Sequence, residues 1–294
     1  MDTTDQLVAI FCKIDDFCKE LDSHSQHRLL TGPRAGGKRG PKASLSVSEI
    51  MTILVMFHHV RFRDFKTFYN GFVVRYWPMY FPQLPSYCRF IAIMKYAIFP
   101  MALFAHIHSG KRTGIYYIDS SCLPVCHLKR SRRHKTFKQI AQYGHTSIGW
   151  FFGLKLHIVI NNQGELMGFK ITQGHRSDSQ QASSLLCQLK GLAFGDKGYI
   201  SKKIFQELYS AGLKLITRKR KNMKSEVLSH YEQQLLNQRG IVETVIGHLK
   251  HHYQVWHTRH RSVLNAMTHL VSALAAYAIE PLKISAIKLL SGIV

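Results

Sequence analysis

Three acidic residues stand out because their positions suit chemistry on a phosphate. Asp119 and Asp196 each come directly after an apolar run, and Glu243 lies in a helical stretch further along the chain. Carboxylates bind Mg²⁺ or Mn²⁺, and two such ions can activate the attacking oxygen and stabilise the leaving oxygen of a phosphodiester. The residue types therefore predict phosphoryl transfer with two metal ions bound by these three acids.

The charge of the chain points to a polyanionic partner. There are 40 Lys and Arg against 17 Asp and Glu, which gives a formal charge of +23 and a pI near 9.9. Self-repulsion of this size opposes folding, so we expect nucleic acid to neutralise it, the alternative being a merely basic enzyme. The hydrophobic fraction of 46% is typical of a globular protein and excludes general disorder.

The elements that must position the acids form an α/β pattern. Apolar runs predict strands, helical periods predict the segments between them, and Asn161–Gly164 has the composition of a hairpin turn. The order predicts a partly parallel sheet with an antiparallel edge. Sites form at the carboxyl ends of strands in such sheets, so Asp119 and Asp196 meet if their strands are neighbours. The expected strands are 114–118, 148–160, 165–172, 192–195 and 213–217, and the expected helices include 178–190 and 201–211.

The region before this pattern is expected to be entirely helical. Residues 4–30 carry a helical period, and Ser46 with Glu49 three residues later forms a capping box. A Gly- and Pro-rich basic linker at 31–43 is either a DNA-binding arm, with Lys38, Arg39 and Lys42 on phosphates, or a solvated connection. We expect a helical DNA-binding domain at 1–110, a catalytic core at 111–260, and a C-terminal helix packed on the core at 261–294. A structural cap is the alternative for the first domain.

Two dense basic clusters flank the acids along the sequence. They are too crowded to serve only as solvated faces, so both are predicted to contact DNA. The first cluster is Lys129, Arg130, Arg132, Arg133 and Lys135, and the second is Arg218, Lys219, Arg220 and Lys221.

Other polar residues receive structural interpretations. Asp178 precedes a helix and is predicted to be its N-cap, while His157 lies in a strand and is expected to be a hydrogen-bonded core residue. Trp256 is expected to pack in the core, with base stacking as the alternative. Cys122 and Cys126 with the histidines that follow do not have the spacing of a zinc site.

The motifs around the acids carry a family resemblance. The chain resembles DDE-type insertion-sequence transposases, whose catalytic core is ribonuclease H-like. Its three acidic motifs match in order at Tyr117–Ser120, Gly195–Tyr199 and Arg239–Glu243. The stretches 149–157 and 259–262 are similar to the bacterial branch of insertion-sequence family nine-eight-two.

The resemblance implies a fold, an activity and further site residues. It implies an enzyme that cuts at terminal inverted repeats and joins the 3′-hydroxyl ends to target DNA, with Asp119, Asp196 and Glu243 binding two Mg²⁺ or Mn²⁺ ions. Arg239 and Lys250 match the DNA-contacting cations of the signature around Glu243, whereas Leu236 replaces its tyrosine. An ion pair with Glu243 is the alternative role for Arg239.

The remaining expectations concern partners, location and rival functions. Double-stranded DNA and self-association in a synaptic complex are the expected partners, with no membrane, in a bacterial cytoplasm near the nucleoid. The rivals are a structure-selective metal-dependent nuclease or resolvase, and a non-catalytic DNA-binding derivative of a transposase. The sequence leaves the terminal repeats and the target site open.

Overall fold

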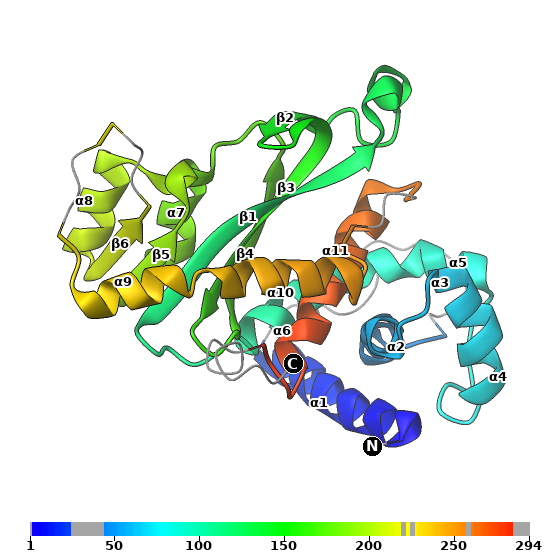
Figure 1. Cartoon of the computed structure of the whole chain (residues 1–294). Helices are drawn as coiled ribbons and strands as arrows, with labels where there is room; N and C mark the ends of the chain where they lie inside the picture. The colour runs from blue at the N-terminus through cyan, green and yellow to red at the C-terminus, as the bar shows by residue number, and fades with distance from the viewer. Residues whose placement is uncertain (1, 25–43, 219–221, 224–226, 257–259, 285–294) are drawn as a thin grey trace. The chain divides into compact units, whose positions relative to one another are not determined.

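The chain folds into two compact units. The computed structural model describes residues 2–24, 44–218, 222–223, 227–256 and 260–284 (Figure 1). One unit contains the residues up to His108 together with 252–255 and 260–279, and the other contains Ser109–His251 with the remaining segments. The boundary between the two units lies at 108/109, where the sequence led us to expect 110/111, and the basic linker at 31–43 lies outside the described residues.

The first unit consists of helices wherever it is described. Helix α1 (Thr3–His24) buries Leu7, Ile10 and Ile14, which have helical spacing. Helix α2 (Val47–Val60) begins at the predicted capping box, since both reciprocal hydrogen bonds between Ser46 and Glu49 are present. The other elements are α3 (Phe65–Thr67), the π-helical turn η1 (Phe68–Val73), α4 (Val74–Tyr76), α5 (Tyr87–Ile93), the 3₁₀ turn η2 (Met94–Ala97), α6 (Ile98–Ile107) and α11 (Val263–Ile279).

The position of α11 corrects one expectation. We expected the C-terminal helix to pack on the catalytic core, but α11 packs against α2, η2 and α6 within the helical unit. Its buried residues extend around most of its circumference, and His58 of α2 lies 2.9 Å from the Ser272 hydroxyl. A helix that is apolar nearly all round needs neighbours on several sides, and these helices provide them.

One apolar run in this unit has the length and composition of a membrane span. Residues 87–107 are long and apolar enough to cross a membrane by length and composition, a test that core helices also pass. Here the run is divided among α5, η2 and α6, and its last part contacts α1 and α11.

The second unit is built on a six-stranded sheet. Strand β1 pairs in parallel with β5, which pairs in parallel with β6, while β3 is antiparallel to β1 on its other side. Strands β2 and β4 both pair antiparallel with β3, one after the other along the same edge. The strands are β1 (Ile115–Cys126), β2 (Gln142–Thr146), β3 (Gly149–Asn161), β4 (Leu166–Gln173), β5 (Gly191–Gly195) and β6 (Leu213–Thr217).

This arrangement confirms the expected mixed α/β fold, with flanking helices and a helical region before it. The strands that lead to Asp119 and Asp196 are direct neighbours, so the two acids lie at the same edge of the sheet. The helical elements of this unit are η3 (Leu128–Arg133), α7 (Asp178–Leu186), η4 (Lys197–Tyr199), α8 (Lys202–Ser210), α9 (His230–Asn237) and α10 (Gly240–His251).

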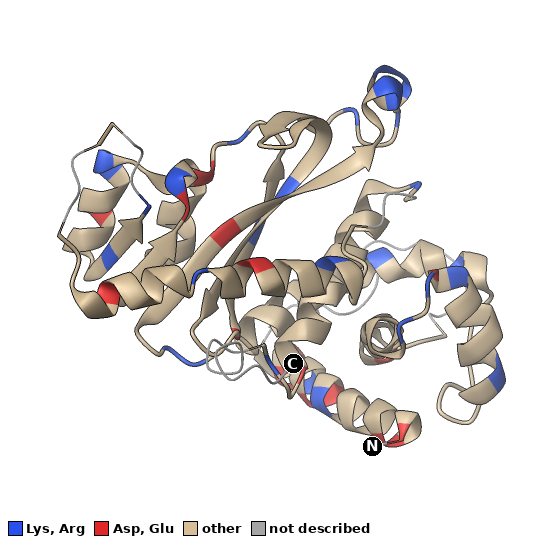
Figure 2. Ribbon diagram, viewed as in Figure 1, with Lys and Arg blue, Asp and Glu red and all other residues tan. Residues whose placement is uncertain are grey.

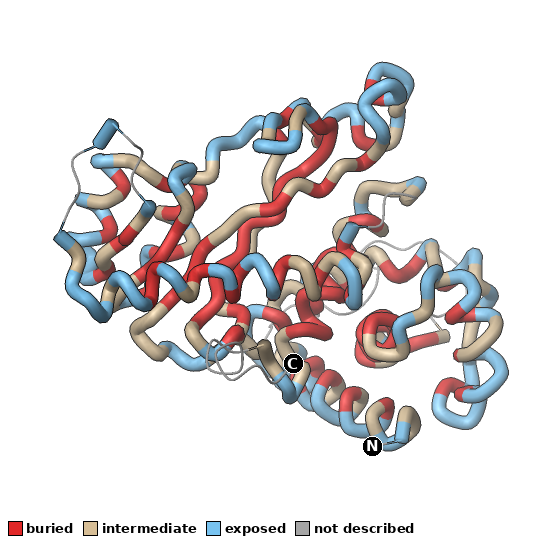
Figure 3. The backbone as a smooth tube through the Cα atoms, in the orientation of Figure 1, coloured by how far each residue is buried: buried red, intermediate tan, exposed pale blue. Residues whose placement is uncertain are grey.

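Helices cover both faces of the sheet near its centre. On one face, Tyr116, Ile118 and Val159 pack in a buried cluster with Leu186 of α7 and Leu208 of α8. On the other face, α10 contacts β1 through a helix side that buries residues such as Val242 and Val245. Figure 3 shows how the buried backbone runs through β1 and β3. Because successive residues of a strand point to opposite faces, adjacent residues of β1 reach different helices.

Two features of the sheet differ from the sequence prediction. Strand β1 does not end at 118 but continues to Cys126, because residues 120–126 pair with β3. The register shifts between Pro124 and Cys126, a β-bulge that accommodates a proline inside the strand. Strand β2 was not predicted, and it forms a two-residue hairpin with β3 through Ser147 and Ile148.

Candidate active site

Asp119 and Asp196 lie level with each other on neighbouring parallel strands. Strand β5 pairs with β1 only as far as Tyr117 opposite Phe194, and continuing that register sets Asp119 opposite Asp196. Asp119 is therefore still paired with β3 on one side of β1, but on the other side it lies beyond the last residue paired with β5. Asp196 follows β5 directly and is the N-cap residue of the short helix η4. The predicted convergence of these two acids is present.

Glu243 reaches the same place from the first turn of α10. Its side chain is 57% exposed, whereas that of Asp119 is only 19% exposed. Tyr117, two residues before Asp119 and on the same face, donates a hydrogen bond from its hydroxyl to Gln238, just before the helix. This contact and the packing of α10 on β1 fix the helix beside the two strand acids.

The electrostatics of Asp119 show that the three acids influence one another. Its pKa is raised to about 6, first because burial disfavours the charged form. The charges of Glu243 and Asp196 raise the pKa further, while the Ser120 backbone N–H and Arg239 lower it. Asp119 thus lies in a site where negative charge exceeds positive charge, a setting that favours binding of a cation.

Arg239 occupies the space between two of the acids. Its side chain is 10% exposed, with Nη2 2.5 Å from Glu243 Oε1 and Nη1 3.6 Å from Asp119 Oδ2. Within the described residues, Nε and Nη1 are buried without a hydrogen-bond partner. The ion-pair role left open for Arg239 is therefore present, although two of its nitrogens still lack acceptors.

The acids do not form a closed metal cage in this arrangement. Among the described residues, no group of three His, Cys, Asp or Glu side chains is close enough to hold one metal ion. The donor set nevertheless suits Mg²⁺ or Mn²⁺, because all three groups are carboxylates and buried Asp119 is short of positive charge. The residues therefore fit such ions chemically, and Arg239 now pairs with two of these carboxylates.

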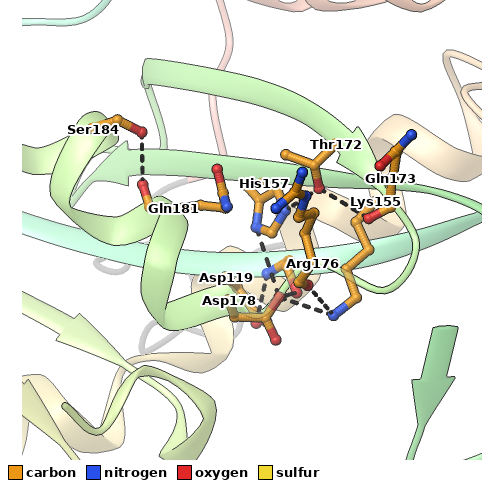
Figure 4. A network of polar contacts seen from close by, with 10 residues as sticks. Asp119, Lys155, His157, Thr172, Gln173, Arg176, Asp178, Gln181 and Ser184 are labelled. Atoms are coloured by element: carbon orange, nitrogen blue, oxygen red, sulfur yellow. Dashed lines mark hydrogen bonds and ion pairs between the residues drawn. The ribbon is translucent and has the colours of Figure 1, made fainter. Parts of the chain in front are cut away.

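A second polar network begins at Ser120, whose side chain points to the other face of the sheet because successive strand residues alternate. Figure 4 draws this network together with Asp119, whose carboxylate accepts a hydrogen bond from the Ser120 backbone N–H. Asp178 accepts hydrogen bonds from the Ser120 hydroxyl at 2.8 Å and from Lys155 Nζ at 3.2 Å. Lys155 also donates to the carbonyl oxygen of Arg176. His157 is fully buried, 3.7 Å from Asp178 and 2.9 Å from the Thr172 hydroxyl. Burial lowers the pKa of His157 to about 4, which keeps the ring neutral near pH 7.

This network tests the roles predicted for His157 and Asp178, and it contains a contact between Asp178 and Ser120 that the sequence did not predict. His157 is the hydrogen-bonded core residue that we expected. Asp178, however, is not the N-cap of α7, because Ser177 holds that position and Asp178 is the first helical residue. Its carboxylate is directed to Ser120, which is 58 positions away in sequence, so no local pattern could reveal the contact.

The sequence of the second unit is similar to a known protein family. Residues 109–263 match the family model described as a transposase DDE domain. The chain belongs to this family. No curated protein matches the chain.

Two candidate DNA-contacting residues of this DDE domain lie together at the end of α10. Lys250 places its ammonium group 4.7 Å from the centre of the Trp256 ring, a cation–π contact. The Trp256 side chain is 46% exposed, so the expectation that it packs in the core is wrong. Both groups are available at the surface of the domain.

The basic clusters of the DDE domain are exposed where they are described. Figure 2 shows blue ribbon, the colour of Lys and Arg, over η3, the small helix beyond the end of β1. Arg218, directly after β6, is also exposed. Lys219, Arg220 and Lys221 lie outside the described residues, as do Lys38, Arg39 and Lys42 of the linker. The exposed positions on η3 and beside it are Lys129, Arg130, Arg132, Arg133 and Lys135.

Proposed function

We propose that this chain is a DNA transposase that cuts at terminal inverted repeats and joins the freed 3′-hydroxyl ends to target DNA. The observation that carries the proposal is the register that sets Asp119 level with Asp196, with Glu243 beside them on α10. Membership of the DDE transposase family supports the same reaction. The similarity of 149–157 and 259–262 to insertion-sequence family nine-eight-two favours that bacterial branch.

Asp119, Asp196 and Glu243 would hold two Mg²⁺ or Mn²⁺ ions. When bound, such ions supply an activated oxygen nucleophile and stabilise the leaving oxygen. The chain supplies the rigid frame: Asp119 is fixed within a paired strand, and its Oδ1 accepts a hydrogen bond from the Ser120 backbone N–H at 2.8 Å. Glu243 is the most exposed of the three, so DNA bound beside the acids would reach it first.

Arg239 and Lys250 would bind the DNA backbone beside the acids. Arg239 has two buried nitrogens without acceptors, and a phosphate oxygen is the acceptor that a guanidinium prefers. Binding a phosphate would draw the guanidinium away from Asp119, leaving that carboxylate to the metal ions. Lys250, eleven residues later on α10, would contact a second phosphate.

The remaining basic residues would extend the contact with DNA. The residues of η3 and Arg218 supply phosphate contacts on the core, and the basic linker and helical unit supply contacts with the terminal repeats. Bringing two transposon ends together requires self-association, so we propose a dimer or larger complex. No membrane partner is proposed, and the working location is the bacterial cytoplasm near the nucleoid.

The test is a strand-transfer assay with labelled terminal repeats and a supercoiled target. The native chain with Mg²⁺ should give both cut ends and joined products, and chelation should abolish both. Asp196→Asn should abolish both products while leaving DNA binding intact, whereas Asp16→Asn, an exposed acid of α1, should behave like the native chain. Metal-dependent cutting that survives Asp196→Asn contradicts the assignment.

The same assay separates the rival functions. Cutting without any joined product in the native chain indicates a nuclease or resolvase. Complete lack of Mg²⁺-dependent cutting on the true terminal repeats, with DNA binding retained, indicates a non-catalytic derivative.

A further inference from the structure

The tip of the β2–β3 hairpin exposes large apolar side chains that are not packed in a hydrophobic core. Ile148, in the two-residue turn, is 97% exposed, and Trp150 at the start of β3 is 64% exposed. Tyr143 on β2 is 44% exposed. Exposing this much apolar and aromatic surface on one short hairpin is costly unless a partner covers it.

The hairpin holds these side chains in fixed positions. Trp150 is the direct cross-strand partner of His145, and the two rings meet edge to face with centroids 5.1 Å apart. Tyr143 is likewise the cross-strand partner of Phe152, and these two rings are tilted with centroids 5.1 Å apart. The Tyr143 hydroxyl is 2.7 Å from that of Ser131, which ties the hairpin to η3. The exposed rings are therefore ordered before any partner binds, which lowers the entropic cost of binding.

The surroundings of the hairpin identify the chemistry of that partner. Residues 120–164 contain no Asp or Glu but seven Lys or Arg. Four of these cations are exposed on η3, the element to which the hairpin is tied. A surface that combines aromatic rings with uncompensated positive charge matches a nucleic acid, because the cations bind phosphates while the rings stack on bases.

The strand register relates the aromatic rings to the candidate active site. Alternate residues of β3 share a face, so Trp150, Phe152 and Ile158 all point to one side of the sheet. Ile158 is the direct partner of Asp119 in the neighbouring strand, so the rings lie on the face of Asp119. Eight residues separate Trp150 from Ile158, which is roughly 26 Å along a strand. A DNA strand that spans this length contains about seven to eight nucleotides.

We propose that the hairpin tip is a stacking site for an unpaired base of the DNA that occupies the active site. Trp150 stacks on the base, and Ile148 is inserted beside it as an apolar wedge. The base lies about seven to eight nucleotides from the phosphate at Asp119. An unpaired or flipped base is required because the faces of paired bases are already stacked within the duplex. The inference rests on the proposed function, since it assumes that DNA binds along this face.

The test compares two DNA probes with identical flanks, a fully paired duplex and a duplex with a central mismatched bubble. The native chain should bind the bubble probe roughly ten times more tightly, which is the effect of stacking one base on an aromatic ring. Trp150→Ala should remove this preference and leave the affinity for paired duplex unchanged, and Trp150→Phe should retain most of it. Arg132→Ala should weaken binding of both probes equally and reduce the salt dependence.

A matched control comes from the same unit. Tyr209 on α8 is 62% exposed and stacks on Phe205, so Tyr209→Ala removes a comparable exposed ring at another place. This variant should retain the preference for the bubble probe. Thermal melting of each variant establishes that it folds.

The outcomes separate this inference from the proposed function. Equal binding of both probes by the native chain, or an unchanged bubble preference in Trp150→Ala, overturns the stacking site but not the transposase assignment. No binding of either probe overturns the proposed function first. Loss of self-association in Trp150→Ala without DNA identifies the tip as a protein interface and also overturns the inference.

Discussion

The two faces of the sheet differ in how far neighbouring cations compensate the charge of a largely buried carboxylate. On one face, Asp119 lies beside Asp196 and Glu243, and its ion pair to Arg239 is long at 3.6 Å. On the other face, one residue further along β1, Ser120 donates to an Asp178 that also pairs with Lys155. An acid whose charge is compensated by the fold stabilises it, whereas acids in excess of their counter-ions need a partner from outside. The contrast agrees with our proposal that a cation and DNA bind at the face of Asp119.

The largest expected effect is a loss of DNA cutting when Asp119, but not Asp178 on the other face, is neutralised. Asp119→Asn should reduce DNA cutting by roughly a thousandfold or more, because metal binding supplies several kcal/mol to the transition state. Without metal, the same variant should melt at a higher temperature than the native chain, since the amide buries no charge. Asp178→Asn should retain most of the cutting activity. If Asp178→Asn abolishes activity as completely as Asp119→Asn, the contrast between the faces fails.

The next effect is on the stability of the compensated face. Asp178→Ala leaves the Lys155 ammonium buried beside a neutral group, which should lower the free energy of unfolding by about 3–4 kcal/mol. Urea unfolding at neutral pH measures the change. Replacing both partners, with Asp178→Leu and Lys155→Met, should restore much of the loss, because no uncompensated charge remains. A loss as large in the double variant as in Asp178→Ala contradicts this account of the pair.

His157 should make the same face sensitive to acid. Its pKa is about 4 in the folded protein, against 6.5 for an exposed histidine, mainly because of burial. Above pH 6.5 the ring is neutral in both states, so it has no effect on stability. Between pH 6.5 and 4 only the unfolded chain takes up this proton, which should cost about 2–3 kcal/mol. Subtracting the unfolding free energies of His157→Gln from those of the native chain isolates this term, and a flat difference contradicts it.

The smallest effect should come from the cation between the acids. Arg239→Gln removes the positive charge beside Asp119 and Glu243 and should destabilise the metal-free chain by roughly 1 kcal/mol or less. Added Mn²⁺ should then raise the melting temperature more in this variant than in the native chain, because the ion replaces the lost charge. An equal shift in both proteins would mean that Arg239 and the metal ions do not share this position.

The sequence predicted most of what local patterns determine. Apolar runs located five of the six strands, and the capping box at Ser46 located the start of α2. The order of motifs indicated that Asp119 and Asp196 would meet, and the parallel pairing of β1 with β5 brings them together. These successes depend on short-range spacing and on the general geometry of parallel sheets.

The misses have physical causes that lie outside any local window. Pro124 made residues 120–126 unlike a strand, yet a bulge beside it lets β1 continue. Strand β2 contains no apolar run, since Tyr143 stands alone among Gln, Gly, His and Thr. The packing of α11 and the contact of Asp178 with Ser120 join residues far apart in sequence, so they depend on the tertiary fold.

Two short strands, β2 and β4, share the edge of the sheet beyond β3, which limits strand pairing between different molecules. Sheets aggregate when a long free edge offers its backbone groups to another chain. Here the position beyond β3 is filled by a strand of five residues followed by one of eight that comes later in the sequence. Neither strand presents a long uninterrupted edge, so a foreign strand would find only short stretches to extend. An interrupted edge of this kind disfavours the strand-to-strand pairing between chains from which amyloid grows.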